Sequence, residues 1–189
     1  MKKMLVMLLI LTVGMVYSQA ETAEFVGSKK CKMCHNKAED GSQYSIWEDG
    51  PHANSYETLM TDAAKAIAKK KGLKTSPEQS PECLSCHVTG WGTATGYQLG
   101  VDPLDKKAVK TNDDLSRVGC ESCHGAGSLY KSKKVKAAIA DGTTTRESVN
   151  LLTITEKTCT VCHNSDSPTY KPFKYATRIK EVAHPAPGK

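Results

Sequence analysis

Four copies of the motif Cys-x-x-Cys-His constrain this chain more than any other feature. All eight cysteines of the 189 residues lie in these motifs, and a histidine follows each second cysteine directly. The motif residues are Cys31, Cys34 and His35; Cys83, Cys86 and His87; Cys120, Cys123 and His124; and Cys159, Cys162 and His163. Disulfides or zinc sites would also use paired cysteines, but neither explains the histidines. Cys-x-x-Cys-His is the attachment motif of c-type haem, so the sequence predicts four covalently bound haem c groups.

The spacing of the motif suits this chemistry. Two thiols bind one porphyrin as thioethers, and the next residue, a histidine, becomes the proximal ligand of the iron. Four haems on so short a chain leave few residues for each, so we expect the porphyrins to form the core with the polypeptide wrapped around them.

Helical spacing of apolar residues predicts a mainly α-helical fold with long loops and no convincing strand. Three longer helices are expected, over 55–71, 129–140 and 172–183, and Gly72 ends the first of them. A short helix should carry the second motif, with Ser80 as its N-cap and Pro81 in its first turn. Another should carry the fourth motif, with Thr153 as its N-cap. The segments 73–81, 88–118 and 164–171 are rich in loop-forming residues. We expect residues 21–189 to form a single tetrahaem domain.

Residues 1–20 resemble a secretory signal peptide that is cleaved after Ala20. Lys2 and Lys3 precede an apolar run over 4–16, which is shorter than the roughly 20 residues that span a bilayer. Export agrees with covalent haem attachment, which takes place outside the bacterial cytoplasm, and it predicts a periplasmic protein without a membrane span. An uncleaved anchor is the alternative. The formal net charge of +6 falls to +4 without Lys2 and Lys3, too low to favour a nucleic-acid partner.

Axial ligands are scarce. Four irons have eight axial positions, the motif histidines fill four, and only His52 and His184 remain as further histidines. We expect both as distal ligands. The other two irons take a different ligand, for which Met60, Tyr130 and Lys131 are weaker candidates, or stay open. Helical spacing favours a core position for Met60. At least one five-coordinate haem is therefore expected.

The chain resembles the tetrahaem cytochrome c-554 family over about 25–130, and more loosely over 155–185. The residues that carry the resemblance are Phe25 to Cys31, Trp47, Pro51-His52-Ala53, Val88 to Gly92, Gly96-Tyr97, Val118 to Gly125, and Phe173-Lys174-Tyr175 before His184. The resemblance implies a helical periplasmic electron-transfer protein with haems in stacked pairs. It also implies that His52 caps the fourth haem, that His184 caps the third, and that the haem on His87 is five-coordinate. One departure is that no histidine lies between His124 and His163, where members have the ligand of the first haem.

Two functional hypotheses follow. We favour an electron carrier between a donor and an acceptor protein, one of which could be another multihaem cytochrome. The alternative is an oxidoreductase or small-ligand binder that acts on nitric oxide, nitrite, hydroxylamine or peroxide at an open haem. For that chemistry the acid–base candidates are Tyr130, Lys131, Asp113, Asp114 and Glu121, none of them well placed by the sequence. The basic segment 131–136 is a docking patch or, as we favour, a solvated helix face.

Overall fold

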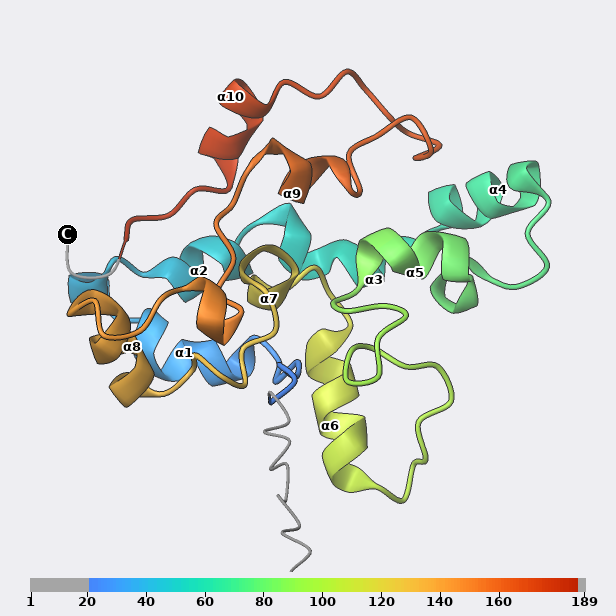
Figure 1. Cartoon of the computed structure of the whole chain (residues 1–189). Helices are drawn as coiled ribbons and strands as arrows, with labels where there is room; N and C mark the ends of the chain where they lie inside the picture. Colours follow the sequence, from blue (N-terminus) through green and yellow to red (C-terminus); the bar gives the residue numbers. More distant parts are fainter. Residues whose placement is uncertain (1–20, 187–189) are drawn as a thin grey trace, which may run out of the picture.

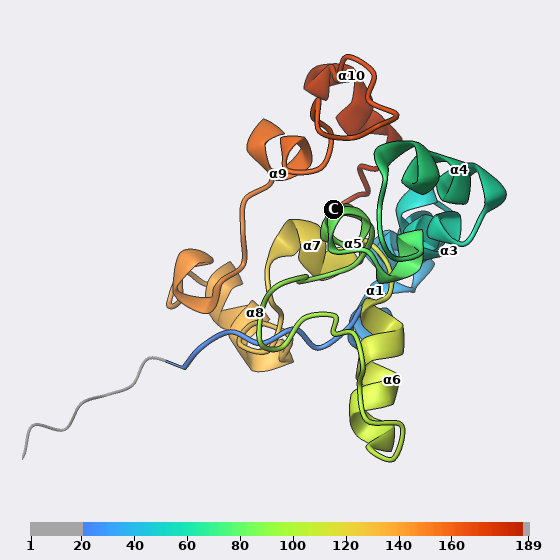
Figure 2. The same ribbon diagram turned by 90° about the vertical axis from the view of Figure 1, so that its right-hand side faces the viewer.

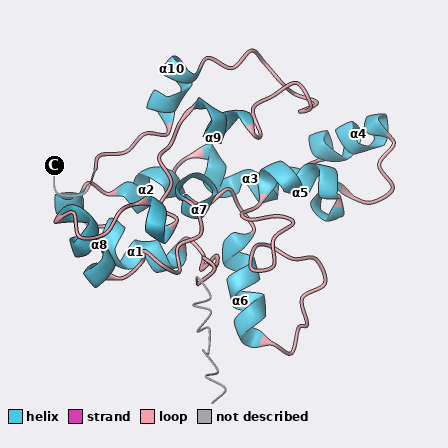
Figure 3. Cartoon of the chain, in the orientation of Figure 1, coloured by secondary structure: helices cyan, strands magenta, loops and turns pink. Residues whose placement is uncertain are grey.

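The computed structural model describes residues 21–186, which form short helices joined by long loops (Figure 3). The α-helices are α1 (Lys29–His35), α2 (Gln43–Glu48), α3 (Ser55–Leu59), α4 (Asp62–Lys71), α5 (Pro81–His87), α6 (Lys106–Leu115), α7 (Cys120–His124), α8 (Lys133–Ala140), α9 (Glu156–Thr160) and α10 (Tyr175–Arg178). The 3-10 helices are η1 (Ala38–Asp40), η2 (Pro51–Asn54), η3 (Pro77–Gln79), η4 (Glu147–Val149) and η5 (Ile179–Glu181). No strand occurs in the described part of the chain, which confirms the predicted fold class.

The helix α7, with the third motif, lies in the middle of the molecule (Figure 1). On one side of it lie α1, α2 and α8, and on the other lie α3, α4 and α5. The helix α6 extends below, while α9 and α10 lie above; the view turned by 90° shows the same placement of α6, α9 and α10 (Figure 2). The helices α1, α5 and α9, with the other three motifs, therefore lie around the third motif.

The hydrophobic core made by the polypeptide is small. It consists of Leu59, Leu84, Val88, Tyr97 and Leu115, with Phe25, Tyr56, Cys83 and Trp91 packed against it. Seven further side chains buried in the structure are polar or charged. A core of this size agrees with a fold whose interior is shared with bulky prosthetic groups.

The predicted helix over 55–71 is wrong in one respect, because it is two helices. The Thr61 hydroxyl accepts a hydrogen bond from the Ala64 N–H (3.2 Å) and so starts α4, after α3 has ended at Leu59. Met60 lies at this break with 47% of its surface exposed, so its expected core position is also wrong. Gly72 ends α4 in the left-handed conformation, as expected.

The helix α6 lies inside 88–118, which the composition predicts to be a loop. Its N-terminus is capped by the Asp105 carboxylate, which accepts from the N–H groups of Lys107 (3.1 Å) and Ala108 (2.9 Å). Its last residue, Leu115, is buried in the core. The helix is mostly polar, with only Ala108, Val109 and Leu115 as apolar residues, and it lies in a segment rich in loop-forming residues, so the composition alone predicted a loop.

Other boundaries shift by a few residues. The predicted start of α5, with Ser80 as N-cap and Pro81 at the first turn, is confirmed. In contrast, α8 starts at Lys133 because Ser132 caps it, and α9 is capped by Thr155 in place of Thr153. The last predicted helix is only α10 followed by η5.

Residues 1–20, with the expected signal peptide, lie outside the described residues, as do 187–189. Between residues 21 and 186, none of the helices has the length and apolar character that a bilayer span requires.

Candidate haem sites

Each motif is presented by a helix or its end. The first three motifs lie in α1, α5 and α7, while the fourth begins in α9 and its histidine follows the helix. On a helix, residues three apart share a face, so the two cysteines of each of the first three motifs project to the same side. All eight cysteines are half-buried free thiols. Within the described residues, no three or more His, Cys, Asp or Glu side chains gather in an arrangement that could hold a metal ion by themselves.

The first motif is positioned by two buried carboxylates. Glu121, inside the third motif, accepts hydrogen bonds from the N–H groups of Val26 (3.0 Å), Gly27 (2.8 Å) and Gly127 (2.6 Å). Asp114, at the end of α6, accepts from the Lys29 N–H (2.9 Å) and so caps α1. Burial raises the pKa of both carboxyls. These two acid–base candidates of the sequence are thus engaged in holding the backbone.

The second motif is tied to α3 through Ser55. The Nδ1 atom of His87 lies 2.5 Å from the Ser55 carbonyl oxygen, and the Ser55 hydroxyl donates to the His87 carbonyl (2.9 Å). With Nδ1–H donated to a carbonyl, Nε2 of His87 carries the lone pair that can bind a metal. The Ser55 hydroxyl also accepts from the Val118 N–H (2.8 Å), which links the second motif to the start of the third.

Two of the motif histidines each lie close to a histidine from a distant segment. The ring centres of His52 and His163 are 6.0 Å apart, and those of His124 and His184 are 5.9 Å apart. Two metal–nitrogen bonds of about 2 Å each, with the distance from each ring centre to its nitrogen, add up to about 6 Å. The rings of each pair are therefore separated by the distance that one metal ion between them requires. Phe173 stacks on the His163 ring, with 4.8 Å between ring centres.

Burial favours the neutral imidazole at His35, His52, His124 and His163 by lowering the pKa of each. Burial lowers the pKa of His124 to about 4, and the nearby His184 and Arg146 add to the effect. Burial also lowers the pKa of His52, with a contribution from His163, and the pKa of His35. Neutral imidazole is the form that binds metals.

Thiols of different motifs lie near enough to change one another's pKa. Cys31 of the first motif interacts with Cys120 of the third, and this contact raises the pKa of the Cys31 thiol. Cys86 of the second motif interacts with Cys162 of the fourth, which lowers the pKa of Cys86 to about 6. These effects link the first motif with the third and the second with the fourth, and the effect of Cys159 on Cys123 links the third with the fourth.

Met60, Tyr130 and Lys131 are the weaker ligand candidates of the sequence. Met60 and Lys131 are exposed, and the Tyr130 hydroxyl donates to the Gly125 carbonyl (2.7 Å). The sequence reasoning missed Lys136, whose Nζ lies 3.3 Å from Nε2 of His35. The two residues are 101 positions apart, so no local pattern connects them. The one signal in the sequence is the departure from the family pattern, in which a histidine after the third motif is the ligand of the first haem.

Comparison with known proteins decides the family. The family described as "Cytochrome c554 and c-prime" matches residues 30–125, more than half of the chain. The chain belongs to this family.

Cytochrome c-554 of Nitrosomonas europaea is 33% identical over 126 residues, which are 65% of this chain and 47% of that protein. The aligned region thus spans about half the length of this relative. The reduced state of cytochrome c554 from the same organism is structurally similar, with a TM-score of 0.54 and 28% identity over 84% of this chain and 78% of the other.

Haem c is accordingly the cofactor of this cytochrome c554 family member, and the four motifs agree with four haems. The residues present fit the group: each motif has two half-buried thiols next to a histidine, and two of these histidines face another histidine at the separation that an iron requires.

Proposed function

We propose that the protein is a periplasmic electron carrier with four haem c groups, similar in role to cytochrome c-554. The proposal rests on one observation in a member of a c-type cytochrome family: His52 faces His163, and His124 faces His184. Irons with two histidine ligands have no free position for a substrate, so they serve electron transfer.

In this proposal the eight motif cysteines form the thioether bonds, and His35, His87, His124 and His163 are the proximal ligands. His52 is the distal ligand opposite His163, and His184 is the distal ligand opposite His124. These assignments account for every histidine of the chain. None is left for the irons on His35 and His87, and we propose that the iron on His87 is five-coordinate.

The thiol contacts support two pairs of neighbouring sites. Cys31 and Cys120 bring the first and third sites together, and Cys86 and Cys162 bring the second and fourth together. Haem c, when bound, supplies one-electron chemistry at each site. The chain holds the two sites of each pair close together, which favours rapid exchange within the protein.

We further propose that residues 1–20 direct export and are removed, and that 21–189 act as one tetrahaem domain. The partners are an electron donor and an acceptor protein, with another multihaem cytochrome as a candidate. Lys131, Lys133 and Lys134 are exposed and could steer an acidic partner, whereas Lys136 is turned inward.

The test compares electron exchange with turnover. Reduced protein is mixed with an oxidised monohaem cytochrome c in a stopped-flow instrument, and separately with nitric oxide, nitrite, hydroxylamine and peroxide. We expect reoxidation by the protein partner to be faster than catalytic turnover of any of the small molecules. Sustained turnover of one of them at a higher rate than the exchange would refute the carrier function and favour an oxidoreductase.

A further inference from the structure

The helix α8 turns one lysine inward. Lys131, Lys133 and Lys134 are exposed, but Lys136 is half-buried, as is Ile139 one turn further along the same face of the helix. A lysine side chain is seldom withdrawn from solvent unless it has a partner. Within residues 21–186, however, Lys136 takes part in none of the ion pairs with a carboxylate.

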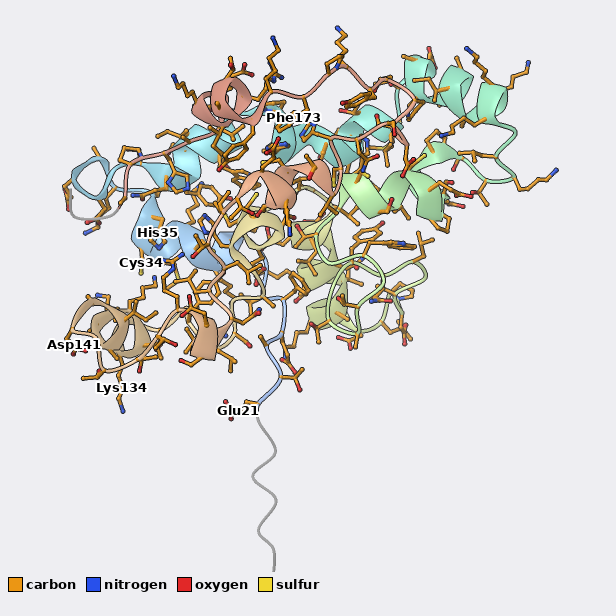
Figure 4. All side chains as sticks on the ribbon, turned by 45° about the horizontal axis from the view of Figure 1, so that its top comes forward. Glu21, Cys34, His35, Lys134, Asp141 and Phe173 are labelled. Atoms are coloured by element: carbon orange, nitrogen blue, oxygen red, sulfur yellow. The ribbon has the colours of Figure 1, made fainter. Side chains whose placement is uncertain are left out.

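The polar partner that the structure gives Lys136 is a motif histidine. Its Nζ lies 3.3 Å from Nε2 of His35, on the side of the ring away from the backbone. Figure 4 shows α8, marked by Lys134, below the end of α1 that carries Cys34 and His35, and the Lys134 side chain points away from His35. The charge of Lys136 acts on His35, whose pKa is lowered first by burial and then by this lysine, and it also acts on Cys31. Lys136 therefore belongs to the first haem site.

This arrangement parallels the two histidine pairs. In each histidine pair, a side chain from a distant segment faces the motif histidine, and the distance between the two rings is close to the one that a single iron between them requires. Two metal–nitrogen bonds of about 2 Å would place Nε2 and Nζ about 4 Å apart, which is slightly more than the distance in the structure. The flexible four-carbon stem of lysine accommodates this difference.

We propose that the Nζ atom of Lys136 is the second axial ligand of the haem on His35. Coordination requires the neutral amine, so the ammonium releases one proton to solvent as its lone pair binds the iron. The inference rests on the proposed attachment of a haem to the first motif. It leaves the iron on His87 as the open one.

The wild-type holoprotein gives the first test, by near-infrared magnetic circular dichroism and electron paramagnetic resonance of the oxidised state. We expect two haems with two histidine ligands, one low-spin haem with the charge-transfer band of histidine and amine ligation, and one high-spin haem. Absence of the amine band would overturn the proposal without the use of any variant.

Variants of α8 give the second test. Lys136→Ala is expected to raise the number of high-spin haems from one to two of the four. Lys136→His is expected to restore a low-spin haem, now with two histidine ligands. Lys134→Ala, on the exposed side of the same helix, is the matched control and is expected to leave the spectra unchanged. An unchanged high-spin count in Lys136→Ala would overturn the proposal.

Mass spectrometry of each protein separates this inference from the proposed function. Fewer than four covalent haems in the wild type would contradict the tetrahaem assignment itself. Four haems with unaltered ligation in Lys136→Ala would contradict only the role of Lys136.

Discussion

Single side chains from distant segments complete the haem sites of this chain. His52 in η2 faces His163, more than a hundred residues away, with 6.0 Å between ring centres. Because no other histidine is free to replace it, His52→Ala is expected to convert one low-spin haem to a five-coordinate, high-spin haem. Electron paramagnetic resonance of the oxidised protein measures this change. Asn54→Ala, at an exposed position of the same 3-10 helix, is the control, and an unaltered spectrum of His52→Ala would show that another side chain binds that iron.

Glu121 shows how one buried carboxylate organises the backbone around a motif. It accepts from three backbone N–H groups, and a glutamine would present an NH2 group to donors. We expect Glu121→Gln to lower the free energy of unfolding by about 1–3 kcal/mol, measured by guanidinium unfolding with circular dichroism. Glu24→Gln, at an exposed position, should have little effect.

The Glu121 carboxyl also determines how the free energy of unfolding changes with pH. Burial raises the pKa of Glu121 above its ordinary value of 4.5, so the folded protein binds the proton more tightly than the unfolded chain does. The free energy of unfolding of the wild type therefore falls as the pH rises from about 4.5 through the folded-state pKa. Glu121→Gln should make this fall smaller, although Asp114, whose pKa is also raised by burial, keeps part of it. A fall of the same size in the variant would assign the whole effect to other groups.

At the scale of elements, the start of α1 depends on its fit against α6. Gly27 has a φ of +85°, and a Cβ atom there would collide with the Asp114 carboxylate. Gly27→Ala is therefore expected to be more destabilising than Gly72→Ala, which has a similar φ of +71° but open space around it. The Gly72 variant should cost only the backbone strain, about 1–3 kcal/mol. Equal losses in thermal unfolding would mean that the contact with Asp114 does not position α1.

The elements differ in how far their sequences predict them. The start of α5 was predictable because Ser80 and Pro81 are strong local signals. The break between α3 and α4 was not, since the apolar spacing continues across it and only the side-chain cap of Thr61 divides the helix. The helix α6 was missed because it is mostly polar and is fixed by the Asp105 cap and by the burial of Leu115.

At the scale of the whole molecule, the local motifs predict where the haems are attached. The side chains that face the motif histidines come from distant segments, so their placement depends on tertiary contacts. The motif residues could be predicted because each motif is a run of five consecutive residues in the sequence. The facing of His52 with His163 and of His124 with His184 was expected only from the family resemblance. The contact of Lys136 with His35 was not expected, because a lysine in a basic segment is ordinarily solvated and no local pattern marks the inward one.

The number of open irons is a property of the whole chain, and carbon monoxide counts them. His52, His184 and Lys136 each face one motif histidine, while His87 has its Nδ1 held by Ser55 and no histidine left for its iron. We expect the fully reduced wild type to bind one carbon monoxide per protein, and Lys136→Ala or His52→Ala to bind two, since only an iron with a free axial position takes up the gas readily. Optical titration of the Soret band measures the stoichiometry. Uptake of none by the wild type would mean that a side chain closes the site on His87, and uptake of two or more would mean that one of the three facing residues is not a ligand.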